Sequence, residues 1–255
     1  MRKNSIEGMG LFGGRSRLEF SSGRRLKINM WNDNSYVSIP LSLENIQVEN
    51  HTLVMGKNLM VVEHLLSALN GLGIFNIQID VFGKEVPFFD GSSQEFVKIL
   101  AHYPESPPPR LKVNTKILVK GENSYILYEP MDGDVLFVEM ELEHPYIGTQ
   151  KLALTINREN YIKEIAPART FVFTTESDPR LKKLPPYGIG ITAQGIYAHE
   201  PLRFDDEPVR HKILDFLGDL YVLKRKLTGR IKAKNTSHAL NLQFVKMLDH
   251  KSTEC

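Results

Sequence analysis

The chain has 255 residues with a formal net charge of +2, and hydrophobic and charged residues make up 42% and 24% of it. This composition is normal for a globular protein of one large domain or two ordinary ones, and the charge is too near neutral to indicate a polyanion partner by itself. The one cysteine, Cys255, excludes an intrachain disulfide framework and a cysteine-based zinc cage. Since no signal-peptide pattern and no run of about 18 apolar residues occur, we expect a cytoplasmic enzyme or binding protein.

In the first half of the chain, strands come before helices. Residues 25–32 and 35–41 alternate between apolar and polar side chains, as half-buried strands do. Residues 58–73 then carry apolar side chains at helical spacing and end in glycines that can stop a helix. A strand over 75–83 and a second helix over 92–103, opened by a serine cap, complete this half.

A proline-rich segment follows. Residues 104–110, PESPPPR, hold four prolines, which cannot lie inside a helix or a central strand. We therefore predict a linker here, between one domain of residues 1–105 and a second of residues 111–255.

The second half repeats the pattern of strands first and helices late. A helix is predicted over 207–225, with Pro208 in its first turn, where proline is tolerated, and a last helix over 237–250. Strands are predicted over residues 124–130, 134–144, 150–156 and 229–235. Clusters of strands with late helices indicate an α+β fold rather than a doubly wound parallel sheet.

The helix predicted over 207–225 carries His211, Asp215 and Asp219 at intervals of four residues. Residues four apart lie one turn apart on the same side of a helix, so His211 and Asp215 can reach one metal ion. Taken alone, the same spacing is common on ordinary amphipathic helices, where a histidine is usually a surface group or a hydrogen-bonded core group.

A second histidine with a neighbouring carboxylate, Glu63-His64, lies in the helix predicted over 58–73. His64, His211 and Asp215 would form an N,N,O site with an open position, which is typical of catalytic rather than structural zinc. Iron(II) also accepts two histidines and one carboxylate. Beside such a site Glu63 would act as the general base that activates water, and its alternative is a solvated helix face.

The segment 236–241, TSHALN, places His238 at the start of the last predicted helix. Asp219 can accept a hydrogen bond from His238 and hold it protonated, as a general acid for a leaving amine. Alone, a histidine in this position is more often a simple cap residue.

Together these segments resemble the zinc-dependent UDP-3-O-acyl-N-acetylglucosamine deacetylase family of lipid A biosynthesis. Five stretches follow one another in the family's order: VVEHLLSALNGLGIFNIQIDVFGKEVPFFDGSSQEF, HPYIGTQ, APARTFVF, LRFDDEPVRHKILDFLGDLYVL and SHALN. The resemblance implies two similar two-layer α/β sandwich domains with the active site at their interface. It also implies a nucleotide-sugar substrate, possible peripheral contact with the inner membrane, and no nucleic-acid partner.

Carried over by position, the resemblance implies the same catalytic groups that the spacing suggests. These are the zinc ligands His64, His211 and Asp215, the base Glu63, and the acid His238 with Asp219 behind it. Lys212 would contact the substrate near the metal, and Thr170 would hydrogen-bond the oxyanion of the tetrahedral intermediate. Phe171 and Phe173 would line the sugar and nucleotide surface, and their alternative is core packing.

The chain departs from the family pattern at positions that would contact the substrate. Phe12 of GMGLFGG stands where the family has a pocket histidine, and Asn235 stands where it has a substrate-contacting lysine. Lys234 would take over the contact of that lysine, although a shift of one residue in a strand points the side chain to the other face.

The segment 174–201 is shorter than in typical members and lacks the GGS insert that forms a passage for the acyl chain. Pro185 and Pro186 further restrict how this segment folds. We therefore expect a long acyl chain to be accommodated less well, and a related N-acetyl sugar without a long acyl chain stays open as an alternative substrate.

Two hypotheses from other functional classes also stand. Six basic residues without an acid lie between positions 224 and 234, and such a run can bind nucleic acid or another anionic surface. More often it is a solvated helix end followed by a strand. The other hypothesis is a catalytically inactive scaffold, against which the presence of both a candidate acid and a candidate base argues.

Overall fold

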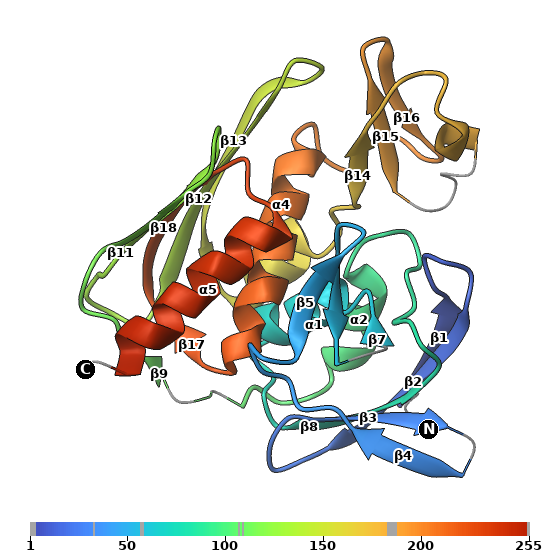
Figure 1. Cartoon of the computed structure of the whole chain (residues 1–255), viewed down its shortest axis with the longest axis vertical. Coiled ribbons are helices and arrows are strands. Elements are labelled where there is room, and N and C mark those ends of the chain that lie inside the picture. The colour runs from blue at the N-terminus through green and yellow to red at the C-terminus, as the bar shows by residue number, and fades with distance from the viewer. Residues whose placement is uncertain are drawn as a thin grey trace.

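The computed structural model describes residues 4–32, 34–56, 59–106, 108, 110–182 and 188–253. Two five-stranded sheets lie on opposite sides of the molecule, with the main helices between them (Figure 1). Cys255 and the pair Pro185 and Pro186 lie outside the described residues.

The first sheet has the strand order β1-β2-β8-β3-β4, in which only β3 and β8 are parallel. Its strands are β1 (Ser5–Met9), β2 (Arg15–Ser22), β3 (Lys27–Asn32), β4 (Ser35–Ser38) and β8 (Ile77–Phe82). Helix α1 (Glu63–Gly71) precedes β8, and α2 (Gln94–Leu100) follows it. A small sheet of β5 (Ile46–Glu49), β6 (Thr52–Met55) and β7 (Leu59–Met60) is inserted just before α1.

The second sheet repeats this topology with the order β10-β11-β18-β12-β13, in which only β12 and β18 are parallel. Its strands are β10 (Ile117–Lys120), β11 (Tyr125–Glu129), β12 (Leu136–His144), β13 (Gly148–Ile156) and β18 (Gly229–Lys234). Helix α4 (Glu207–Leu220) precedes β18, and α5 (His238–Thr253) follows it. Because both units have the same strand order and the same helix positions, the predicted α+β fold and its internal repetition are confirmed.

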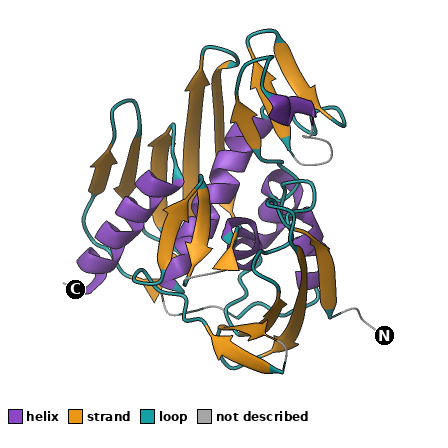
Figure 2. Ribbon diagram, turned by 45° about the vertical axis from the view of Figure 1, so that its right-hand side comes forward, coloured by secondary structure: helices purple, strands orange, loops and turns teal. Residues whose placement is uncertain are grey.

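The second unit also carries an inserted sheet before its first main helix. This sheet contains β14 (Phe171–Phe173), β15 (Ile189–Thr192) and β16 (Gly195–Ala198), and it projects from one end of the molecule (Figure 2). The remaining short elements are β9 (Arg110–Leu111), α3 (Arg158–Asn160), a π-helical turn (Tyr161–Ile165), two 3₁₀ turns (Pro179–Lys182 and Tyr221–Leu223) and β17 (Lys226–Leu227).

The sheets bury one face each because their side chains alternate. In β18, Ile231 and Ala233 are buried, whereas the alternating residues Arg230, Lys232 and Lys234 are partly exposed. A strand with this period presents one face to the helices and the other to solvent. In Figure 1, α4 and α5 cover the face of the second sheet that points toward the interior of the molecule.

Helices α1 and α4 pack directly against each other, and this contact joins the two units. The amide of the Asn70 side chain donates to the carbonyl oxygen of Leu217 at 2.7 Å. Close approach depends on Gly218, where a Cβ atom would lie 2.3 Å from the carbonyl oxygen of Glu63. The absence of a side chain at this glycine therefore sets the distance between the two helices.

One local prediction needs correction. The first helix begins at Glu63, not at residue 58, because residues 59–60 pair with β6 as strand β7. Between them, the buried residue Val61 has a left-handed backbone with φ of 63°. This conformation is strained for a β-branched side chain, by roughly 1–3 kcal/mol, and the fixed strand β7 before it holds the turn.

Two other predicted features, the serine cap of α2 and the linker, can be located in the structure. At the start of α2, Ser92 Oγ accepts from the Gln94 amide at 3.2 Å, whereas the side chain of Ser93 donates to the carbonyl oxygen of His64 at 2.8 Å. In the predicted linker, Arg110 pairs with Lys226 in a short parallel ladder, so the segment is anchored at this end. Residues 107 and 109 of the linker lie outside the described residues.

Candidate active site

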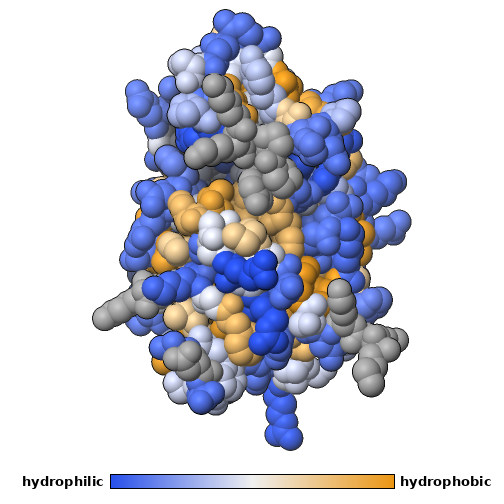
Figure 3. All heavy atoms as spheres, turned by 90° about the vertical axis from the view of Figure 1, so that its right-hand side faces the viewer, coloured by the Kyte–Doolittle hydropathy of each residue, from blue (hydrophilic) through white to orange (hydrophobic). Residues whose placement is uncertain are grey.

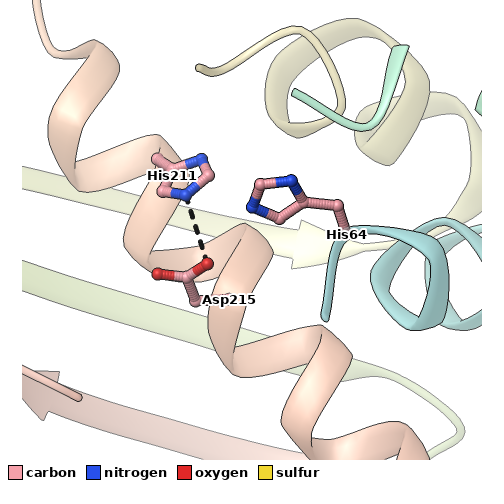
Figure 4. Close-up of side chains that lie close together, drawn as sticks. All are labelled: His64, His211 and Asp215. Carbon is pink, nitrogen blue, oxygen red and sulfur yellow. Dashed lines mark ion pairs between the residues drawn. The ribbon is translucent and has the colours of Figure 1, made fainter. Parts of the chain in front are cut away.

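Three potential metal ligands meet where α1 and α4 pack together (Figure 4). His64 lies in the first turn of α1, and His211 and Asp215 lie one turn apart on α4. Their ligand atoms all lie within 4.8 Å of one another, and all three residues are buried. The structure thus brings together, from two helices far apart in the sequence, the three residues that the spacing proposed as ligands.

Both ring nitrogens of His211 face oxygen atoms. Nδ1 lies 3.1 Å from the carbonyl oxygen of Ala168, and Nε2 lies 3.2 Å from Oδ1 of Asp215. A neutral imidazole has one N–H and can donate to only one of these oxygens. When Nδ1 donates to Ala168, Nε2 directs a lone pair toward Asp215, and a cation between the two atoms satisfies both.

The spacing of these atoms also fits a shared ion. Two donor atoms held at about 2.0–2.1 Å on one tetrahedral zinc stand about 3.3 Å apart. Burial, followed by the charge of His211, lowers the pKa of His64 to about 3, so this ring is neutral at pH 7, as a metal ligand must be. Burial alone would raise the pKa of Asp215, but His211 and Lys212 outweigh it and hold the pKa well below its usual range.

Glu63 is buried beside the candidate ligand His64, with 3% of its surface exposed. One carboxylate oxygen accepts the backbone N–H of Leu53 at 3.0 Å. Burial raises the pKa of Glu63 to about 7, although the positive charge of His238 opposes this rise. A carboxyl group with a pKa near neutrality can both take and return a proton at physiological pH, as a general base requires.

His238 and Asp219 form the predicted pair. Nδ1 of His238 lies 2.9 Å from each carboxylate oxygen of Asp219, and Asn241 donates to the same carboxylate at 2.7 Å. Burial disfavours the charged ring, but the carboxylates of Asp219 and Asp215 outweigh it and raise the pKa of His238 to about 10. The ring is therefore protonated at pH 7 and can donate a proton from Nε2.

Thr170 is held on both sides by backbone hydrogen bonds. Its N–H donates to the carbonyl oxygen of Gly91 at 2.8 Å, and its carbonyl oxygen accepts from Ile189 at 2.8 Å. Gly91 and Gly188 both have positive φ and no room for a Cβ atom, which would lie within 2.6–2.7 Å of atoms of Thr170. This tight packing fixes the position of the Thr170 backbone next to the residues that hold His211.

Rings form a path away from the metal ligands. The Phe171 and His211 rings meet edge-on with their centres 6.2 Å apart, and the centres of the Phe173 and Phe171 rings are 5.3 Å apart. Phe173 then stacks on His144 at 3.6 Å with only 7° between the ring planes. The ammonium group of Lys212 lies 5.3 Å from the centre of the Phe171 ring and 3.4 Å from Oδ2 of Asp215.

Beyond His144 the path reaches a groove of about 710 Å³ at the end of the second sheet. Lys234 and Asn235 both line it, together with Ser124, Glu143 and His144. The ammonium group of Lys234 is 3.0 Å from Glu141 and also pairs with Glu143. Lys234 thus belongs to this groove, on the solvent face of the sheet, and not to the cluster of candidate metal ligands.

Phe12 lies in the loop between β1 and β2, where its side chain is 52% exposed. Its backbone N–H donates to the carboxylate of Glu85 at 2.8 Å, and so does that of Gly14 at 3.1 Å. Met9 at the end of β1 and Leu11 in the loop are each 40% exposed, so this region presents three large apolar side chains to solvent.

The run of basic residues between 224 and 234 is largely paired with acids. Arg230 contacts Glu139 at 2.6 Å, and Lys232 contacts Glu129 at 3.4 Å. Arg225 and Lys226 reach aspartates at 3.8 Å and 3.4 Å. These contacts, two of them across neighbouring strands of the second sheet, favour the interpretation of the run as a solvated, ion-paired face.

Sequence reasoning missed two contributors to the site. The carbonyl oxygen of Ala168 orients His211, and no sequence pattern marks a backbone acceptor that comes from a distant segment. Asn241, which donates to Asp219, stands three residues after His238 and so shares its helix face, a signal that was available.

Comparison with known proteins gives concordant matches. The model of the family described as UDP-3-O-acyl N-acetylglycosamine deacetylase matches residues 1–250. A protein of Syntrophotalea carbinolica is 35% identical over 228 residues, covering 83% of this chain and 73% of that protein. Relatives from Oleidesulfovibrio alaskensis (35% identical, 76% of this chain and 67% of the relative) and a Psychrobacter species (37%, 76% and 71%) also match. All three are named UDP-3-O-acyl-N-acetylglucosamine deacetylase.

Proposed function

The chain belongs to the UDP-3-O-acyl N-acetylglycosamine deacetylase family, and from this membership we propose that it hydrolyses the acetamide of a UDP-linked 3-O-acyl-N-acetylglucosamine in lipid A biosynthesis. The products are acetate and the free amine of the sugar. The observation that carries the proposal is the buried cluster of His64, His211 and Asp215 with Glu63 beside it and the His238–Asp219 pair close by.

The metal of the proposed site is zinc. Its support is the donor set of two imidazoles and one carboxylate, with the 3.2 Å spacing of His211 Nε2 and Asp215 Oδ1. The same donors suit iron(II), which stays the alternative. When bound, the ion would polarise the acetamide carbonyl and make a water molecule more acidic.

Proton transfer falls to two side chains. Glu63 takes a proton from the attacking water, whose oxygen adds to the carbonyl carbon of the acetamide. As the tetrahedral species breaks down, the bond from that carbon to nitrogen is cleaved, and His238 gives its proton to the leaving nitrogen. A pKa of about 10 keeps His238 protonated at neutral pH, and a pKa of about 7 leaves a substantial fraction of Glu63 deprotonated and able to accept a proton.

Two further side chains would act on the substrate. Thr170, with a backbone fixed between Gly91 and Ile189, offers its hydroxyl to the oxyanion. Lys212 adds a positive charge beside Asp215, where charge develops on the carbonyl oxygen.

The nucleotide half of the substrate would lie along the ring path toward the groove at the end of the second sheet. Phe171 and Phe173 offer apolar edges for the sugar, and the groove of about 710 Å³ has a size suited to a nucleotide. Asn235 in the groove replaces the lysine of the family pattern, so it would contact phosphate by hydrogen bonds rather than by charge.

The acyl chain would extend over the apolar part of the face shown in Figure 3, where apolar side chains gather below the projecting sheet. The exposed Leu11 and Phe12 of the β1–β2 loop, with Met9 at the end of β1, make this region suitable for peripheral contact with the inner membrane from the cytoplasm. Among the described residues, none of the helices is both long enough and apolar enough to cross a membrane.

The test is acetate release on a small panel of N-acetyl sugars. The proposal expects release from the UDP-linked 3-O-acyl substrate by the wild-type protein and none by Asp215→Ala. Efficient release from a free N-acetyl sugar but not from the UDP-linked substrate would favour the alternative substrate. Release from none of them, together with salt-dependent oligonucleotide binding, would overturn the enzyme assignment in favour of an anion-binding module.

A further inference from the structure

A buried ion pair lies one helical turn before the metal ligands. Glu207, in the first turn of α4, has no exposed surface, and Arg169 is 3% exposed. One carboxylate oxygen of Glu207 accepts the backbone N–H and the Nε–H of Arg169 at 2.9 and 2.8 Å, and the other accepts Arg169 Nη2 at 3.1 Å. The catalytic scheme has no use for this pair, and a buried pair of charges is a weak source of stability.

The pair is connected to the part of the site formed by the second unit. Arg169 lies between Ala168, whose carbonyl oxygen orients His211, and Thr170. Glu207 precedes His211 by four residues, so both side chains leave the same side of α4. Through Arg169, the Glu207 carboxylate therefore fixes the segment 168–170 against the helix face that carries the ligands.

Arg203 extends the network to the first unit. Its backbone N–H donates to Glu207 at 2.8 Å, and its guanidinium donates to the carbonyl oxygen of Pro167 at 2.8 Å and to Asp90 Oδ2 at 2.6 Å. The other oxygen of Asp90 accepts the backbone N–H and the hydroxyl of Ser92 at 3.0 and 2.7 Å. The guanidinium thus bridges the segment before Thr170 and a loop of the first unit.

That loop reaches the third ligand. Ser93, next to Ser92, donates its hydroxyl to the carbonyl oxygen of His64 at 2.8 Å, and its N–H donates to Ala166 at 3.0 Å. Hydrogen bonds therefore lead from Glu207 on α4 through Arg203 and Asp90 to Ser92, and its covalent neighbour Ser93 bonds to the backbone of His64 on α1.

We propose that the Arg169–Glu207 pair and the Arg203–Asp90 bridge are a positioning network for the metal site. The network touches neither the ligand atoms nor the substrate path. It sets the orientation of ligands from two units relative to one another, which a site assembled from two helices needs. The proposal rests on the proposed metal site, and it concerns how tightly and in what geometry that site holds its ion.

The test uses Asp90→Asn and Arg203→Lys, because this bridge is partly exposed, with side chains 25% and 24% accessible, and both variants are expected to fold. Glu207→Gln is a second variant, for which folding is less assured because Arg169 would stay buried beside a neutral partner. Arg230→Lys is the matched control: its guanidinium meets Glu139 at the same 2.6 Å, at the far side of the second sheet.

Two readouts separate positioning from general stability: zinc affinity by competition with a chelator, and the visible spectrum of the cobalt(II)-substituted protein, which reports coordination geometry. We expect both Asp90→Asn and Arg203→Lys to weaken zinc binding about 10–100-fold and to change the cobalt spectrum. Arg230→Lys should leave both unchanged.

The outcomes are distinct. If the wild-type protein binds no zinc, or if His211→Ala binds zinc as tightly as wild type does, the proposed metal site itself is wrong. If wild-type protein binds zinc and both bridge variants keep its affinity and cobalt spectrum, the positioning role is wrong, whatever their unfolding temperatures. If Glu207→Gln folds, it must show the largest loss of zinc affinity among the three variants, because Glu207 contacts both Arg169 and Arg203.

Discussion

Gly218→Ala tests whether the close contact of α1 and α4 sets the geometry of the site. A Cβ atom at this position would lie 2.3 Å from the carbonyl oxygen of Glu63, whereas ordinary contact begins at 3.4 Å. Relief of the clash requires the two helices to separate by 1.1 Å, the difference between these two distances. His64 and Glu63 lie on one of these helices and His211 and Asp215 on the other, so the separation enters the ligand geometry directly.

The sign of the stability change is informative. In an unhindered helix, glycine to alanine stabilises by about 1 kcal/mol. Here overpacking opposes that gain by roughly 1–3 kcal/mol, so a net loss of about 1 kcal/mol is expected. A misplacement of about 1 Å in a catalytic site lowers the rate about 100-fold, so kcat should fall far more than stability does.

The measurements are the free energy of unfolding in urea and kcat for acetate release. Gln243→Ala on the exposed side of α5 is the control, and it should leave kcat unchanged. A Gly218→Ala variant that is about 1 kcal/mol more stable than wild type and fully active would refute the argument.

Three further predictions concern the two proton-transfer side chains, the pH dependence of the rate and the acyl chain of the substrate. Glu63→Ala and His238→Ala should each lower kcat roughly 10²–10⁴-fold while one metal ion per chain is retained. The pH–rate profile of wild type should rise as Glu63 loses its proton, at or below its metal-free pKa of about 7, and fall as His238 loses its proton near 10; a His238→Ala variant that keeps the upper limb would contradict the acid role. Across substrates from acetyl to long 3-O-acyl chains, each methylene should add less than the roughly 0.8 kcal/mol of full burial, because segment 174–201 is short; a rise of about fourfold per methylene would show a complete passage instead.

Local patterns predicted much of the fold. Alternation predicted four of the five strands of the second sheet and missed β10, and the helices α4 and α5 were also predicted. The same reasoning started α1 too early, because Leu59 and Met60 are apolar in a strand as they would be in a helix. The reversal that separates them from α1 depends on Val61 in a left-handed conformation, which no propensity of valine predicts.

For the site, spacing within one helix was informative and contacts between units were not. The interval from His211 to Asp215 fixes their shared helix face, so their proximity follows from the helix alone. That His64 joins them depends on the packing of α1 against α4, which involves Gly218. The roles of the Ala168 carbonyl and of Glu207 arise from tertiary contacts, so the sequence shows only an unremarkable alanine and a helix-start glutamate.

The central claim is that one ion, held by His64, His211 and Asp215, drives the removal of acetate. The direct measurement is acetate release from UDP-3-O-acyl-N-acetylglucosamine by chelator-treated protein during a zinc titration. The account predicts no release without metal and full activity at one equivalent of zinc per chain, with no recovery in His211→Ala. Unchanged release after complete removal of metal, or full recovery in His211→Ala, would contradict it.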